Sequence, residues 1–166
     1  MKDPLIGVAA TLYGWIVKIA RWLQPVFLLC VRLYWGWQFF ITGKGKLESI
    51  PKVTDYFQSL GIPFPGLNAY MAGCTECFCG LFLLLGIASR ITTVPLIITM
   101  IVAYLTASQD AVKQIFQNQD PFLKDDAFTF LAAAVIVFVF GPGLFSVDGL
   151  IGHLLKKKSA GEKAGA

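Results

Sequence analysis

The chain has 166 residues, of which 56% are hydrophobic and only 14% are charged. In soluble domains about a quarter of the residues are charged, so this composition predicts an integral membrane protein. The net charge of +4 does not indicate a nucleic-acid partner, because no basic and aromatic recognition motif accompanies it. Three adjacent lysines follow an apolar segment, namely Lys156, Lys157 and Lys158. They predict binding to the anionic headgroups of membrane lipids on the cytoplasmic side.

Residues 1–24 predict an amphipathic helix at the membrane surface. Apolar residues recur at intervals of three and four from Leu5 to Leu23, with Lys18 and Arg21 near the end of the segment. The segment lacks the charged start, long apolar core and small-residue cleavage site of a signal peptide, so we expect it to be retained. Pro25 suits the first turn of a new helix.

Four apolar segments then predict an all-α membrane protein, a four-transmembrane-helix bundle with amphipathic surface helices. The segments cover residues 25–42, 67–87, 91–108 and 127–140. Short surface helices are expected in the two long connections, the first between a start at Ser49 and a stop at Gly61, and a last one over 147–156 after Ser146. We divide the chain into an interfacial helix (1–24), a membrane domain (25–152) and a basic cytoplasmic tail (153–166).

The basic residues predict the orientation in the inner, cytoplasmic membrane of the cell. Four crossings place eight lysines and arginines on the side of the termini and five on the other side. Because the more basic side stays inside, we expect both termini in the cytoplasm.

Glu76 stands in the middle of the second apolar segment and Arg32 in the middle of the first. Charges inside a membrane are costly and normally face a partner within the protein, so we expect these two side chains to meet near mid-depth. One interpretation is a polar site that binds a quinone head group or relays protons, beside Tyr34, Trp35 and Cys79. The other is a buried pair that fixes the register of two helices. The two interpretations are compatible.

Glycines and other small residues accompany both charges. Arg32, Gly36 and Gly43 share one helical face, and Glu76 shares its face with Gly73 and Gly80. Small residues let membrane helices approach closely, so the sequence predicts that these two faces pack together.

Cys74 and Cys77 form a CxxC pair, the spacing of a redox dithiol. The pair lies inside an apolar segment rather than at a helix N-terminus that would stabilise a thiolate. Packing of small, soft residues is therefore the competing interpretation.

Other candidate sites are few. Lys44 and Lys46 follow the first segment, where they snorkel to headgroups or attract an anionic substrate. A single histidine, His153, excludes a haem held by two histidines of this chain, and the cysteines lack the paired spacing of a zinc site. We expect no metal and no cofactor held within the chain, with a quinone as the one candidate ligand.

Several motifs, taken in order, strongly resemble the DoxX family over about residues 26–150. They are Arg32, Gly43 and Lys46, the loop from Phe57 to Pro65, Glu76 with Gly80, Leu83 and Gly86, then Arg90, and the turn from Gly141 to Gly143 with Ser146 and Asp148. The resemblance implies a four-helix bundle related to the small subunit of archaeal thiosulfate:quinone oxidoreductase, and partners such as a superoxide dismutase or a sulfurtransferase. Leu144 replaces a basic residue common after the turn, and the cysteine cluster is not part of the family pattern.

Three functional hypotheses follow. The first is a membrane subunit of a redox or respiratory-type complex that binds a quinone near Arg32 and Glu76. The second is a non-catalytic accessory subunit that stabilises a larger membrane assembly, or a homo-oligomer. The third, a small-solute channel, would require a polar stripe through several helices, whereas polar residues concentrate in two of the four segments.

Overall fold

The computed structural model describes the backbone of residues 4–164 and the side chains of residues 8 and 10–155. Its regular secondary structure is entirely helical within those ranges, which confirms the all-α prediction. The elements in chain order are α1 (Pro4–Glu48), α2 (Ile50–Ser59), α3 (Pro65–Cys74), the π-helical turn η1 (Thr75–Cys79), α4 (Gly80–Leu85), α5 (Ser89–Thr106), α6 (Gln109–Lys113), α7 (Asp120–Lys124), α8 (Asp126–Phe140) and α9 (Val147–Ala164).

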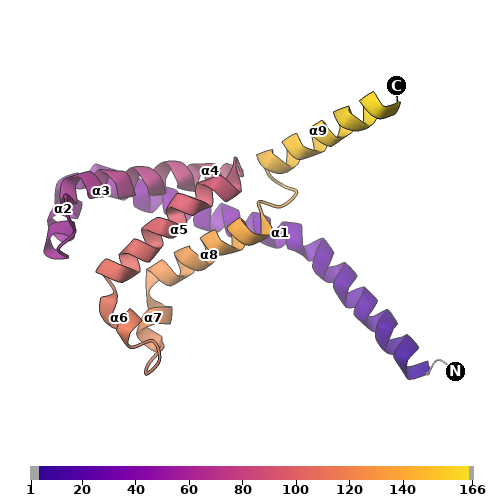
Figure 1. Ribbon diagram of the computed structural model, residues 1–166, viewed down its shortest axis with the longest axis horizontal. Helices are drawn as coiled ribbons and strands as arrows, with labels where there is room; N and C mark the ends of the chain where they lie inside the picture. The colour runs from indigo at the N-terminus through magenta and orange to yellow at the C-terminus, as the bar shows by residue number, and fades with distance from the viewer. Residues whose placement is uncertain (1–3, 165–166) are drawn as a thin grey trace.

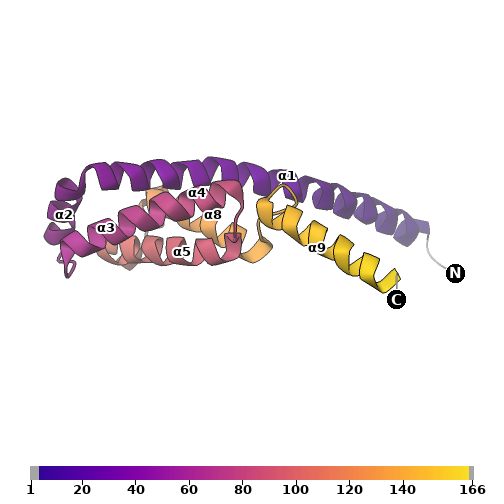
Figure 2. The same cartoon turned by 90° about the horizontal axis from the view of Figure 1, so that it is seen from above.

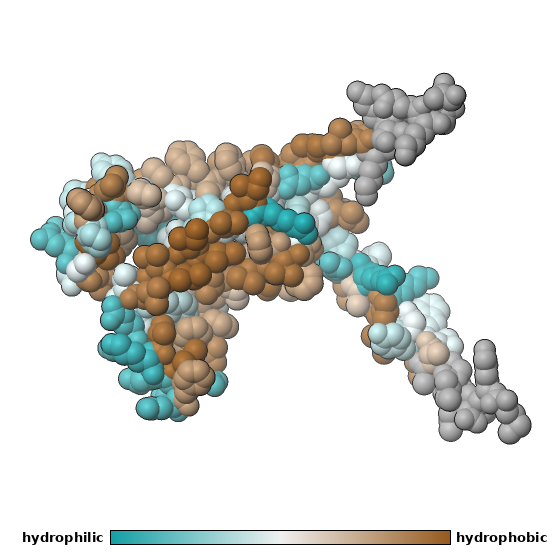
Figure 3. Space-filling model, in the orientation of Figure 1, coloured by the Kyte–Doolittle hydropathy of each residue, from teal (hydrophilic) through white to brown (hydrophobic). Residues whose placement is uncertain are grey.

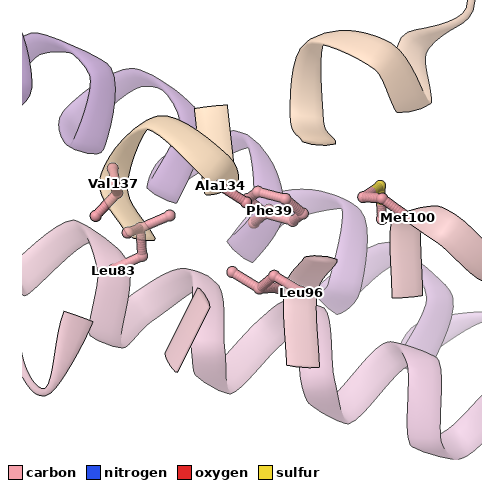
Figure 4. Packing of buried hydrophobic residues seen from close by; sticks show 6 residues of the cluster. All are labelled: Phe39, Leu83, Leu96, Met100, Ala134 and Val137. Atoms are coloured by element: carbon pink, nitrogen blue, oxygen red, sulfur yellow. The ribbon is translucent and has the colours of Figure 1, made fainter. Parts of the chain in front are cut away.

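Four helical segments pack side by side as the body of the molecule. They are the C-terminal half of α1, the continuous helix formed by α3, η1 and α4, and helices α5 and α8 (Figures 1 and 2). The N-terminal half of α1 and helix α9 both extend beyond one end of this body, and α2, α6 and α7 lie at the other end. Each of the four segments contributes to the core cluster shown in Figure 4, which consists of Phe39, Leu83, Leu96, Met100, Ala134 and Val137.

The surface of the body is largely apolar. Two helices of the described chain are long and apolar enough to cross a membrane, Pro65–Leu85 and Ser89–Thr106, and α8 is apolar but shorter. On the face shown in Figure 3, hydrophobic side chains dominate the middle of the body, and hydrophilic residues gather around α2 and around α6 and α7. This distribution suits a protein with its middle in lipid and one end in contact with water.

Helix α1 corrects the prediction of a new helix at Pro25. The helix is continuous over 45 residues and contains Pro25 in its interior. Proline removes one backbone hydrogen bond and kinks a helix without necessarily ending it. In Figure 1, α1 bends as it leaves the body, so the interruption expected from the sequence is a bend rather than a break.

The connecting helices follow the predicted signals closely. Ser49 is the N-cap residue of α2, and Gly61, with φ of 72°, follows its end. Ser146 accepts a hydrogen bond from the backbone N–H of Gly149 at 2.9 Å, as expected for a helix start. Helix α9 continues to Ala164, eight residues beyond its predicted end at residue 156.

Candidate functional site

Glycines bring α1 into backbone contact with the α3–η1–α4 helix. A Cβ atom on Gly43 would lie 2.2 Å from the backbone nitrogen of Cys77, and one on Gly36 would lie 2.7 Å from that of Leu84. A Cβ atom on Gly80 would lie 2.6 Å from the backbone nitrogen of Phe40. None of these positions has room for a larger residue, so the predicted packing of the two small-residue faces is confirmed.

Arg32 is buried, and backbone carbonyl groups surround its guanidinium. Nε donates to the carbonyl of Leu83 at 3.1 Å and Nη2 to that of Leu84 at 3.2 Å. Nη1 donates to the carbonyls of Pro142 at 2.6 Å and Phe145 at 3.0 Å. The first two belong to the last turn of α4, where helical carbonyls have no partner within their own helix. Arg32 therefore caps α4 and ties the loop between α8 and α9 to it.

Asp148 completes the same junction from the start of α9. Its carboxylate accepts hydrogen bonds from the backbone N–H groups of Ala88 at 2.7 Å and Ser89 at 2.8 Å, at the N-terminus of α5. Its own N–H donates to the carbonyl of Gly86 at 3.0 Å. Gly86 has a φ of 73°, and a Cβ atom there would lie 2.4 Å from Nη2 of Arg32, so the turn requires glycine. One end of the bundle is thus held by an arginine and an aspartate that each bind backbone groups.

Glu76 forms an ion pair with Lys46, and this pair is the second polar centre. The carboxylate is 1% exposed and its Oε1 accepts a hydrogen bond from Nζ of Lys46, whose side chain is 32% exposed. Oε2 is also buried and accepts no hydrogen bond from the described residues. A buried carboxylate oxygen without a donor is unfavourable by about 1–3 kcal/mol, so this atom is the least satisfied polar group of the centre.

The predicted pairing of Arg32 with Glu76 is wrong. Arg32 binds at the level of Leu84, eight residues beyond Glu76 along a helical path, which corresponds to about 12 Å. Helix α1 continues past Thr42 to Glu48, so Lys46 is still helical and lies close to the level of Glu76. The sequence did contain a signal for the pairing of Lys46 with Glu76. Lys46 is three residues after Gly43 and lies on the same helical face as Gly43 if the helix continues.

The segment that carries Glu76 is a π-helical turn, which the sequence did not predict. Residues Thr75–Cys79 form η1 between two α-helical segments, and such turns occur frequently at functional sites. Cys74, Cys77 and Cys79 are free thiols of intermediate burial. Within the described part of the chain no three side chains among His, Cys, Asp and Glu gather as metal ligands.

The remaining candidate residues lie apart from these two centres. Tyr34 is 58% exposed, and its ring meets Trp35 edge to face at 4.9 Å between centroids. Trp35 also packs against Phe130 at 5.1 Å. Lys44 is exposed and pairs with Glu48 at 3.6 Å, one turn along the same helix. These contacts are typical of packing and of surface ion pairs.

Comparison with known proteins identifies the family of the chain. The family model for DoxX matches residues 27–109, half of the chain, which include Arg32, Lys46 and Glu76. An uncharacterized membrane protein of Mycobacterium tuberculosis is 29% identical over 136 residues, which cover 75% of this chain and 80% of that protein. No solved structure matches the chain. The chain therefore belongs to the DoxX family of membrane proteins.

Proposed function

We propose that this protein is a four-crossing membrane subunit that acts as a non-catalytic accessory component of a larger membrane assembly. The crossings are the C-terminal half of α1, the α3–η1–α4 helix, α5 and α8. An even number of crossings puts both ends of the chain on one side, in agreement with Figure 1, where the N-terminal half of α1 and helix α9 leave the same end of the body. The greater number of lysines and arginines on that side makes it cytoplasmic, in the inner membrane.

One observation carries this proposal: the buried charges of the membrane region bind groups of the chain itself. The guanidinium of Arg32 makes four hydrogen bonds to backbone carbonyls. Glu76 binds Lys46, and together the two centres join α1 to the middle and to the C-terminal end of the α3–η1–α4 helix. Arg32 caps the last carbonyls of a helix, which is a structural role and not one in substrate turnover. The DoxX resemblance favours soluble or membrane-bound redox enzymes as the partners.

The test is the state of the chain in its native membrane. A tag placed at Asn118, in the connection between α6 and α7, allows purification in a mild detergent, with a tagged membrane protein of similar size as the matched control. We expect a second protein in fixed stoichiometry, and the same pair when the partner carries the tag. A chain that purifies alone or only with copies of itself, under conditions that preserve other membrane complexes, contradicts the accessory role.

A second candidate function is a quinone-linked redox subunit, which the unpartnered Oε2 of Glu76 favours. A hydroxyl of a reduced quinone would donate the hydrogen bond that this oxygen lacks. The test is extraction of the purified chain with organic solvent and measurement of the quinone per chain, compared with a Glu76→Gln variant. About one quinone per wild-type chain and much less in the variant would support this function. An equal, low content in both would reject it.

A further inference from the structure

The N-terminal half of α1 carries an apolar face that no other part of the described chain covers. We name residues 8–24 of this helix the arm. It leaves the body at the bend of α1 and extends away from the other helices (Figures 1 and 2). Its large apolar side chains are 48–73% exposed; they are Val8, Leu12, Tyr13, Trp15, Ile16, Ile19, Trp22 and Leu23. Exposed apolar surface on this scale requires either lipid or another protein.

The arm arranges its residues as an interfacial helix does. Ile16, Ile19 and Leu23 recur at intervals of three and four and so share one face, whereas Lys18 and Arg21 lie on the opposite face. Trp15 and Trp22 are seven residues apart and flank the apolar face on the side of Lys18, whose Nζ lies 5.5 Å from the centroid of the Trp15 ring. In a membrane surface, apolar side chains lie at the acyl chains, tryptophans lie at the interface and cations lie at the headgroups. The arm has its residues in this order.

A hollow continues the apolar face where the arm joins the body. Five residues of α1 line it together with Phe140 at the end of α8, namely Ala20, Leu23, Gln24, Phe27 and Leu28. Its volume is about 380 Å³ and all of its lining except Gln24 is apolar. Ile16, Ala20, Leu23 and Phe27 are spaced by four, three and four residues, so they run along one face from the arm into the hollow. An acyl chain that follows this face would fill the hollow.

Helix α9 leaves the same end of the body with a similar face. Its exposed apolar residues follow the helical repeat; they are Val147, Leu150, Ile151, Leu154 and Leu155. Two amphipathic helices at one end of the bundle suit a shared leaflet surface, because each can turn its apolar face to the acyl chains.

We propose that the arm lies in the surface of one leaflet and binds an anionic phospholipid, with an acyl chain in the hollow and the phosphate near Lys18 and Arg21. The charge of the two cations is the reason to choose an anionic lipid, and the continuity of α1 with the membrane region is the reason to choose lipid over a protein partner. The proposal rests on the membrane placement in the proposed function but not on the accessory role.

Tryptophan fluorescence tests this binding directly. The chain has four tryptophans, so a Trp35→Phe and Trp37→Phe variant retains only Trp15 and Trp22, both in the arm. The full chain is reconstituted in vesicles that contain both phosphatidylcholine and phosphatidylglycerol. In one sample part of the phosphatidylglycerol is brominated near the headgroup, and in the other an equal amount of phosphatidylcholine is brominated instead. Circular dichroism is the control that tests whether the variant is folded. The complementary Trp15→Phe and Trp22→Phe variant supplies the signal of the body for subtraction from the wild type if the first variant misfolds.

We expect brominated phosphatidylglycerol to quench the arm roughly threefold more than brominated phosphatidylcholine, because two cations face the headgroups. Lys18→Gln with Arg21→Gln should bring the two lipids to equal quenching, and Lys44→Gln with Lys113→Gln, at the other end of the body, should not. Quenching by aqueous acrylamide without quenching by brominated lipid would overturn the proposal, and so would equal quenching by both lipids in the wild type. Neither result would change the stoichiometry of a native complex, so failure here is distinct from failure of the accessory role.

Discussion

Replacement of Arg32 by methionine should destabilise the bundle strongly. Methionine fills a similar length of the buried site but donates no hydrogen bond. The four carbonyl groups that accept from the guanidinium, in the last turn of α4 and in the loop before α9, would lose this donor, although the carbonyl of Leu83 would keep the N–H of Gly86 at 3.2 Å. The Arg32 side chain is itself buried, and its hydrogen bond to Leu83 is fully buried, so water replaces the guanidinium poorly there.

The structure allows the magnitude to be bounded. Hydrogen bonds between membrane helices contribute about 0.6 kcal/mol each on average, and hydrogen bonds to charged groups contribute at least about 1.5 kcal/mol. Four bonds therefore correspond to about 2 kcal/mol at the first value and to about 6 kcal/mol or more at the second. Removal of a buried charge also removes its desolvation cost, which places the expected loss near the lower part of that range, at about 3 kcal/mol.

The assay is reversible unfolding in mixed micelles, followed by circular dichroism as the fraction of denaturing detergent rises. Arg21→Met is the matched control, because Arg21 is an exposed arginine on the arm of the same helix. We expect the control to stay within about 0.5 kcal/mol of the wild type, as exposed substitutions usually do. If Arg32→Met is as stable as the control, the capping role of Arg32 is refuted.

Two further substitutions test the contacts around the polar centres. Gly43→Ala should cost about 1–3 kcal/mol by the same assay, because its Cβ would press against the backbone of Cys77. Gly45→Ala, which has open space around it, should be neutral or slightly stabilising; equal effects at both positions would refute the close approach. Asp148→Ala should cost about 1–2 kcal/mol and speed hydrogen exchange at the start of α5, since two capping bonds are lost. The exposed Asp110→Ala variant should leave that exchange unchanged, and unchanged exchange in Asp148→Ala would contradict the cap.

Periodicity and composition were sufficient to predict much of the fold. Helices α5 and α8 begin and end within two residues of their predicted limits, because apolar runs with clear stops leave little choice. The contact between Gly43 and the α3–η1–α4 helix was also predictable, since glycines repeated on one helical face allow close packing. The threonines of α5 bond back to carbonyls of their own helix as their type suggests, with Thr99 donating to Pro95 at 2.9 Å.

The partners of the buried charges could not be predicted in the same way. The sequence displays side chains, whereas Arg32 binds backbone carbonyls that become available only where α4 ends and where the loop after α8 folds back. The apolar run stops at Thr42 and so predicts that Lys46 follows the first crossing, yet helical hydrogen bonds continue to Glu48. The π-helical turn at Glu76 has no distinct sequence signature, since it differs from an α-helix only in which carbonyl each N–H reaches.

The same limit explains the error at Pro25. Its missing N–H and its ring disfavour a helix interior, but a long helix with apolar contacts on its C-terminal half can absorb one lost hydrogen bond by bending. The sequence shows where the helical hydrogen bond is lost, but it does not show whether the helix bends or ends there. The bend nevertheless has a consequence for function, because it directs the arm away from the body.

The most direct test of this account is a pair of double-mutant cycles on the unfolding free energy. One cycle combines Lys46→Met with Glu76→Met, and the other combines Arg32→Met with Glu76→Met. Contacting charges couple by about 0.5–3 kcal/mol, whereas separate sites add within about 0.3–0.5 kcal/mol. We predict coupling between Lys46 and Glu76 and additivity between Arg32 and Glu76. Additivity in the first cycle, or strong coupling in the second, would contradict two separate polar centres.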